Sequence, residues 1–243
     1  MKLLLLAGTH EARQLAALLA QERRVTAIAS LAGVTRQPEP LPIPTRIGRF
    51  GGRAAFVEYL HREGIEALLD ATHPFAAKIS QRCAEVAREM GLPHLQLLRP
   101  PWRPRPGDDW HFIDHEGQAA EHIPSGATVL LATGSQSLHR FDNMPDRHLI
   151  CRQIRAPKGA FPHENGEYLI GRPPFSVDQE IRLFKQRGID WLVVKNAGGQ
   201  MSQSKLLAAR ALGIPVLLIN RPPAPDCARV ETVQAALSWV RGL

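Results

Sequence analysis

Short apolar runs alternate with segments of helical periodicity along almost the whole chain, and this alternation constrains the fold more than any other feature. The first run, residues 2–7, is continuously apolar after its first residue. A strand with one face in solvent would instead alternate apolar and polar residues. Intervening segments such as residues 75–90 repeat apolar residues every three or four positions, as an amphipathic helix does. The pattern predicts an α/β fold with mostly parallel sheets covered on both faces.

The alternation continues to both ends of the sequence. Strands are predicted at residues 2–7, 25–30, 67–71, 94–98, 128–132, 148–154, 190–194 and 215–219. Helices are predicted at residues 11–21, 75–90, 135–141, 177–187, 202–212 and 230–240, and around residues 56–60. Residues 36–50 and 156–174, which are rich in proline or glycine, are predicted to be long connections.

A proline-rich segment interrupts this rhythm near the middle of the chain. Residues 99–107 contain four prolines, a density that excludes a helix or a central strand and predicts a stiff extended connector. It separates two α/β halves of similar length. We therefore predict an N-terminal domain of residues 1–109 and a C-terminal domain of residues 110–243.

The composition limits the class of protein and its location. The chain has 243 residues, 44% of them hydrophobic, which is enough for buried cores. No apolar run approaches the roughly 20 residues that cross a bilayer. The apolar opening stops at Gly8 and charged residues follow, so it is too short for a signal peptide. These features predict a cytoplasmic protein that does not bind membranes.

Charge and metal-binding residue types narrow the possible partners. The net charge of +7 favours an acidic partner, or reflects only a composition rich in arginine. The arginines are dispersed and aromatic residues make up 6% of the chain, so we expect no nucleic-acid partner. Three widely spaced cysteines and ten scattered histidines predict no disulfide framework and no metal site. The sequence does not indicate an oligomeric state.

The residues just after the first two predicted strands are candidates for binding a nucleotide, because ligands of open α/β sheets bind at the carboxyl ends of the strands. Gly8, Thr9 and His10 follow the first strand, but the full G-x-G-x-x-G fingerprint is absent, so a simple strand–helix turn remains an alternative. The second strand ends at Ser30 rather than at an acidic residue, and Arg36 follows. If a dinucleotide binds, these two residues favour NADPH; a loop start and a surface charge are the alternative.

Polar residues also cluster after three later strands. The third strand carries Asp70 at its end, and Thr72, His73 and Pro74 follow it; we interpret this cluster as functional rather than only as a helix cap. The second half presents residues 133–136 and 195–199 in the same way, with simple loops as the alternative. No G-x-S-x-G, H-E-x-x-H, Walker or C-x-x-C motif points to another reaction class.

Together these motifs resemble the precorrin-6A reductases of cobalamin (vitamin B12) biosynthesis. The resemblance rests on L-A-G-T-H-E-A-R at residues 6–13, D-A-T-H-P-F-A at 70–76, T-G-S at 133–135, K-N-A-G-G at 195–199, A-R-A-L-G-I-P-V at 209–216 and N-R-P at 220–222. The motifs occur in order over almost the whole chain. The segment at residues 70–76 is the most distinctive of them.

The resemblance implies an oxidoreductase that reduces one double bond of precorrin-6A with NADPH to give precorrin-6B. It also implies two Rossmann-like domains with the active site between them. Its pattern places these residues at the cofactor: Gly8, Thr9, Glu11, Ala12, Ser30, Thr72, His73, Pro74, Phe75, Thr133, Gly134, Ser135, Lys195 and Asn196. The strand ends described above add His10 and Arg36 to the predicted cofactor contacts.

The substrate is a tetrapyrrole with a rim of carboxylates, so its site should be rich in cations. On charge and position, Arg152, Arg155, Lys158 and Lys205 are the predicted substrate contacts. The reduction also needs a proton, for which His73 and Lys205 are candidates beside solvent water. The alternatives are a reductase of another acidic substrate, including the cobalt-containing form, and a nucleotide-sensing module without chemistry.

Overall fold

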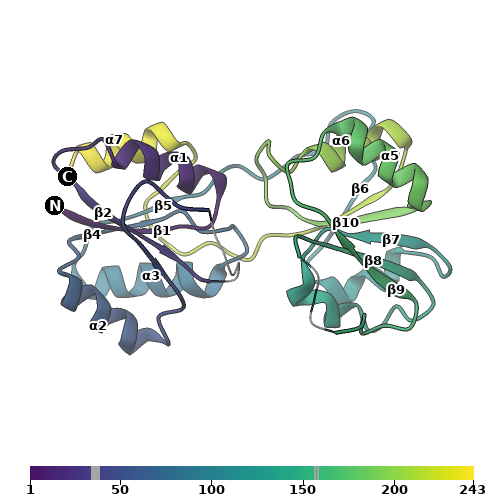
Figure 1. The fold of residues 1–243 in the computed structure, drawn as a ribbon, viewed down its shortest axis with the longest axis horizontal. Helices are drawn as coiled ribbons and strands as arrows, with labels where there is room; N and C mark the ends of the chain where they lie inside the picture. The colour runs from purple at the N-terminus through teal and green to yellow at the C-terminus, as the bar shows by residue number, and fades with distance from the viewer. Residues whose placement is uncertain (34–38, 156, 158) are drawn as a thin grey trace. The chain divides into compact units, whose positions relative to one another are not determined.

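The computed structural model describes residues 1–33, 39–155, 157 and 159–243 (Figure 1). The chain divides into two compact units of similar size. Unit 1 comprises Met1–Pro100 and Pro222–Leu243, and unit 2 comprises Pro101–Arg221. Each unit contains one sheet of six strands, all paired in parallel, so the predicted α/β class with parallel sheets is confirmed.

Unit 1 has the strand order β12-β5-β4-β1-β2-β3. Its strands are β1 (Lys2–Leu6), β2 (Thr26–Leu31), β3 (Thr45–Ile47), β4 (Ala67–Asp70), β5 (His94–Leu97) and β12 (Arg229–Val230). Its helices are α1 (His10–Leu19), α2 (Arg53–Glu63), α3 (Ala77–Met90) and α7 (Val233–Arg241). Helices α1 and α7 pack on one face of the sheet and α2 and α3 on the other (Figure 1).

Unit 2 has the strand order β6-β11-β10-β7-β8-β9. Its strands are β6 (Trp110–Ile113), β7 (Thr128–Leu131), β8 (His148–Gln153), β9 (Gly166–Ile170), β10 (Trp191–Lys195) and β11 (Val216–Ile219). Its helices are α4 (Ala119–His122), α5 (Val177–Arg187) and α6 (Ser204–Leu212), with short 3₁₀ turns at Glu116–Gln118 and Ser135–Phe141. Helices α5 and α6 pack side by side (Figure 1).

The two sheets share one spatial arrangement. Counted from β1, unit 1 runs 3-2-1-4-5-6, the strand order of the dinucleotide-binding Rossmann fold. Counted from β7, unit 2 has the same order, with β9, β8, β7, β10 and β11 in the first five places. The sixth place differs in origin, because β12 comes from the end of the chain whereas β6 precedes the other strands of its unit. Both units are therefore Rossmann-like.

The central strands are buried because both faces of each sheet are covered. Leu3, Leu4, Leu5 and Leu6 of β1 are at most 2% exposed, which explains the continuous apolar run in the sequence. Helix α1 begins where the hydroxyl of Thr9 accepts a hydrogen bond from the N–H of Ala12. The core of each unit thus holds the carboxyl ends of its strands in place.

The predicted domain boundaries differ from the structure at two points. Unit 2 already begins at Pro101, because Trp102 is buried in the core of that unit. Residues 222–243 belong to unit 1 rather than to the C-terminal half, since β12 pairs with β5 and α7 packs against α1. The proline-rich segment is a connector as predicted, without helix or strand between residues 98 and 109.

Several strands lie where the sequence predicted connections. Strand β3 lies within residues 36–50 and β9 within residues 156–174. Strand β6 lies in the segment before residue 122, and β12 precedes the last helix. All four lie at or next to the edge of a sheet, where a strand needs fewer apolar residues. Their short runs carry little periodicity, so pattern alone does not separate them from loops.

The packing of α7 makes a prediction about stability. Leu237 is 3% exposed within the core of unit 1, so Leu237→Ala should lower the free energy of unfolding by about 3 kcal/mol through the cavity it leaves. The exposed neighbour Ser238, changed to alanine, is the matched control. Hydrogen exchange should report loss of protection in β1, with β10 unchanged. Loss confined to β10 would contradict this assignment of the C-terminal helix.

Candidate active site

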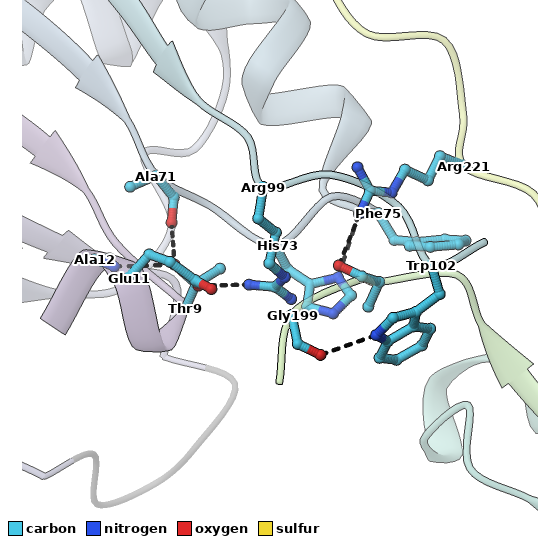
Figure 2. Close-up of polar contacts among 11 residues, drawn as sticks. Thr9, Glu11, Ala12, Ala71, His73, Phe75, Arg99, Trp102, Gly199 and Arg221 are labelled. Atoms are coloured by element: carbon cyan, nitrogen blue, oxygen red, sulfur yellow. Dashed lines mark hydrogen bonds and ion pairs between the residues drawn. The ribbon is translucent and has the colours of Figure 1, made fainter. Parts of the chain in front are cut away.

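The switch point of unit 1 lies between β1 and β4, where successive strands are added on opposite sides of the sheet. Ligands of open α/β folds bind at the carboxyl ends of the strands at such a point. The hydroxyl of Thr9 donates a 2.9 Å hydrogen bond to the carbonyl of Ala71 and so ties the two strand exits together (Figure 2). A Cβ on Gly8 would lie 3.8 Å from the backbone nitrogen of His73, which shows how closely the exits approach. The predicted residues of these two motifs therefore do lie together.

Asp70 holds the backbone of the β4 exit. Its side chain is 1% exposed and accepts hydrogen bonds from the N–H of Thr72 at 3.0 Å and from the amide of Gln96 at 3.4 Å. The hydroxyl of Thr72 lies 3.2 Å from that of Ser80 in α3. Asp70 is thus a buried support for the turn that carries His73, rather than a group facing a ligand.

The imidazole of His73 has a defined orientation. Its Nδ1 accepts a 3.3 Å hydrogen bond from the N–H of Phe75, and the two ring centroids lie 5.9 Å apart. Because Nδ1 accepts, the neutral ring carries its proton on Nε2. Nε2 is then the ring nitrogen that can donate a hydrogen bond.

The start of α1 presents residues of different exposure. Gly8 and His10 are exposed, and Glu11 forms a 2.6 Å ion pair with Arg99 at the β5 end of the connector (Figure 2). Ala12 is fully buried, and Thr9 binds its N–H. The prediction that Ala12 lines the cofactor therefore differs from the structure, because neither its side chain nor its N–H faces outward.

A cationic group lies at the ends of β2 and β3. The Ser30 hydroxyl accepts a 2.8 Å hydrogen bond from the guanidinium of Arg46, which also stacks 4.0 Å from the centre of the Phe50 ring. Arg36, which the sequence predicts for this role, lies outside the described ranges. Arg46 is not among the predicted residues because β3 is predicted as a connection; the β-branched residues on both sides of Arg46 are the signal that indicates the strand.

Unit 2 has an equivalent switch point between β7 and β10. Lys195, at the end of β10, donates a 3.0 Å hydrogen bond from Nζ to the carbonyl of Thr133, which follows β7. Burial lowers the pKa of Lys195, while the nearby Glu116 carboxylate opposes this and Arg140 adds to it. Gly134 next to Thr133 has φ +78°, a left-handed conformation that favours glycine. The structure thus joins the two predicted motifs of unit 2.

The side chain of Asn196 binds the main chain of Trp102 within unit 2. Asn196 is 6% exposed, and its side-chain amide bonds both main-chain groups of Trp102, accepting from the N–H at 2.8 Å and donating to the carbonyl at 3.2 Å. The side chain of Asn196 is thus used to hold the main chain of Trp102, and the predicted place of Asn196 at the cofactor stays a prediction. The side chain of Ser135 lies outside what the structure describes.

Of the predicted substrate contacts, Arg152 is buried in an ion pair, whereas Arg155 is exposed. Arg152 is 9% exposed and forms a bidentate ion pair with Glu180 at 2.7 and 2.6 Å, against the ring of Phe175. A guanidinium paired with a buried carboxylate is held inside unit 2, so this geometry differs from the rim contact that the sequence predicted. Arg155 is exposed, and Lys158 lies outside the described residues.

Lys205 occupies the first turn of α6, at the carboxyl edge of the unit 2 sheet. Its ammonium donates a 2.7 Å hydrogen bond to the carbonyl of Ser202. Burial lowers its pKa to about 8, while the negative charge of Glu180 opposes the shift and the positive charge of Arg152 adds to it. The ammonium is therefore an acid of moderate strength near neutral pH.

The burial of Lys205 predicts the pH at which its ammonium titrates. In protein whose lysines carry ¹³C-methyl groups, the Lys205 resonance should titrate near pH 8, because desolvation disfavours the charged form. Loss of that resonance in Lys205→Met assigns it. The ammonium form, and any activity that needs it, should disappear as the pH rises through that value. A midpoint at 10.5, the ordinary value for lysine, would contradict the buried environment.

The described parts of both units show neither a membrane span nor a metal-binding cluster. Within residues 1–33, 39–155, 157 and 159–243, no helix combines the length and apolarity of a membrane span. In the same ranges, no three His, Cys, Asp or Glu side chains are placed to hold a metal ion.

Comparison with known proteins gives a consistent family. The model of the precorrin-6x reductase family CbiJ/CobK matches residues 2–241. A precorrin-6A reductase of Rhodococcus erythropolis is 43% identical, covering 98% of this chain and 97% of its own, and one of Rhodobacter capsulatus is 39% identical, covering 98% and 95%. A solved CobK precorrin-6A reductase is 38% identical, with a TM-score of 0.93 over 100% of this chain and 96% of that one.

More distant relatives carry a different name. A cobalt-precorrin-6A reductase of Priestia megaterium is 27% identical, covering 90% of each chain. The matched residues include both switch points and all the motifs on which the resemblance rests. This chain therefore belongs to the precorrin-6x reductase CbiJ/CobK family.

Proposed function

We propose that this protein reduces one double bond of precorrin-6A with NADPH, giving precorrin-6B, in the biosynthesis of cobalamin. The observation that carries the proposal is the match of the family model to residues 2–241, with relatives named precorrin-6A reductases aligned over nearly their full length. The Rossmann order of unit 1 supports a dinucleotide at its switch point.

The residues at the unit 1 switch point fit this cofactor. Gly8 allows a close approach at the β1 exit, and the start of α1 offers backbone N–H groups and the positive end of its dipole to a pyrophosphate. Thr72, His73, Pro74 and Phe75 would then flank the nicotinamide, from the neighbouring β4 exit. The shape of this exit is maintained by Asp70.

The 2′-phosphate of NADPH has a matching group in unit 1. The end of β2 carries Ser30 rather than an acidic residue that would bind the 2′-hydroxyl and repel a phosphate. The guanidinium of Arg46 donates a hydrogen bond to the hydroxyl of Ser30. A hydroxyl and a guanidinium side by side form the charge-assisted bonds that a phosphate favours.

The cofactor and the protein chain would contribute different parts of the reaction. The bound cofactor supplies the hydride. The chain binds and orients both reactants and must leave a proton source near the reduced bond. His73, Lys205 and solvent water are the candidates; burial lowers the pKa of the Lys205 ammonium to about 8, so this group can release a proton near neutral pH.

The metal-free substrate is favoured over the cobalt-containing one. Relatives named precorrin-6A reductases are 37–43% identical to this chain, whereas those named cobalt-precorrin-6A reductases are 25–28% identical. For the carboxylates of either macrocycle, Arg155 and Lys205 remain the proposed cations.

Turnover tests the function directly. Purified protein mixed with NADPH and metal-free precorrin-6A should consume NADPH and change the visible spectrum of the macrocycle as conjugation is lost. Cobalt-precorrin-6A should react more slowly. Absence of NADPH oxidation with both tetrapyrroles would reject the proposal and favour a reductase of another acid, or a nucleotide-binding module.

The proposed phosphate contact predicts a change in cofactor preference. Arg46→Ala should raise the KM for NADPH about 10- to 100-fold, because a charge-assisted hydrogen bond contributes about 1.5–3 kcal/mol, while the KM for NADH stays nearly constant. The exposed Arg49 in the same segment, changed to alanine, is the control. Equal effects on NADPH and NADH would show that Arg46 does not read the phosphate.

A further inference from the structure

We propose that the Lys195–Gly199 turn of unit 2 binds a carboxylate of the substrate, and that Trp102 and Arg221 are positioning residues that hold this turn in its binding shape. The inference rests on the proposed function, because it takes the carboxylates of the tetrapyrrole as its ligand.

The turn lies where unit 2 should bind ligands. It begins at the last residue of β10, and β10 pairs with β7 and β11 on its two sides. The chain continues from β7 to β8 on one side and from β10 to β11 on the other, so the turn begins at the switch point. A ligand at the carboxyl edge of this sheet would meet these residues first.

Side chains from distant parts of the sequence bind the carbonyls of the turn. The indole N–H of Trp102 donates to the carbonyl of Gly199 at 2.9 Å (Figure 2). Arg221 donates to the carbonyls of Asn196 at 2.7 Å and Ala197 at 2.9 Å. Three of the five carbonyls in the turn are therefore held by these two side chains.

With those carbonyls bound, the turn retains N–H donors. Gly198 and Gly199 have φ values of +67° and +80°, which other residues adopt only with strain. Their N–H groups donate to no other residue in the described part of the chain. Successive N–H groups in such left-handed turns form concave sites for anions.

Two side chains beside the turn have the chemistry of an anion site. The ammonium of Lys195 lies 3.0 Å from the carbonyl of Thr133. The Thr133 side chain is 8% exposed, and its hydroxyl has no hydrogen-bond partner among the described residues. A buried hydroxyl without a partner is rare in folded proteins and often marks a ligand site. An ammonium, a hydroxyl and backbone N–H groups are the donor types that bind the acceptor oxygens of a carboxylate.

Trp102 and Arg221 would position the turn through their hydrogen bonds to its carbonyls. A turn with two left-handed glycines has many accessible conformations, and each lost carbonyl bond makes more of them available. Trp102→Phe keeps most of the buried ring but removes the bond to Gly199. Arg221→Gln removes bonds to Asn196 and Ala197 without emptying a core position. Both changes should weaken binding at the turn without altering its donors.

The test measures two affinities for each variant. Precorrin-6A is titrated in the presence of NADP⁺, which cannot deliver hydride, and the Kd is read from the visible spectrum. Trp102→Phe and Arg221→Gln should each raise this Kd about five- to tenfold. The Kd for NADPH, measured separately, should change less than twofold.

Matched controls separate positioning from general loss of packing. Trp110→Phe also removes an indole N–H, but one without a hydrogen-bond partner among the described residues. Arg147→Gln also removes guanidinium bonds to carbonyls, those of Ile123 and Ala120. Both controls should leave the Kd of precorrin-6A unchanged. Circular dichroism confirms that each variant is folded.

Other outcomes would overturn the inference in distinguishable ways. An unchanged Kd for precorrin-6A in folded Trp102→Phe and Arg221→Gln would reject the positioning role. A raised Kd for NADPH with no change for precorrin-6A would assign the turn to a cofactor phosphate instead. Equal losses in the controls would show a general effect of packing. If the wild-type protein neither binds nor reduces precorrin-6A, the proposed function itself fails.

Discussion

Parallel strand pairing is the constraint on which both units depend. Because every pair in the two sheets is parallel, the carboxyl ends of all strands of a unit lie at one edge of its sheet. The order 3-2-1-4-5-6 then leaves a switch point next to the central strand, between β1 and β4 in unit 1 and between β7 and β10 in unit 2. Residues separated by more than sixty positions, such as Thr9 and Ala71, become neighbours only for this reason.

The sequence predicts the central strands well because burial on both faces leaves a continuous apolar run. The run before Gly8 is such a case, and β1 ends within one residue of its predicted boundary. Strands β3 and β9 lack this signal, since a strand at the edge of a sheet is held mainly by its one neighbour. The placement of β12 in unit 1 is also absent from any local pattern, because it depends on pairing with β5 more than a hundred residues earlier.

In the candidate site, too, residues with a local sequence signal are predictable, and residues whose contacts depend on the fold are not. Gly8, Thr9 and His73 are recognisable because a strand exit, a helix cap and a polar cluster are local features. The burial of Arg152 with Glu180 is not local, because the two residues come from β8 and α5 and meet only in the folded unit. The same holds for Arg46, whose contact with Ser30 requires β3 to pair with β2. Residue type suggests a charge at these positions, but only the fold shows which charges are already paired.

Both binding edges are shaped by side chains bonded to distant backbone groups rather than by regular secondary structure. In unit 1, Thr9 binds the carbonyl of Ala71 and Asp70 binds the N–H of Thr72. In unit 2, Trp102 and Arg221 bind carbonyls of the turn after β10. Turns held in this way lose little additional entropy when a ligand binds, which favours affinity and orientation at once. The proposed reduction must bring a hydride donor to one bond of a large macrocycle, and we expect it to depend on that orientation and therefore on these supporting bonds.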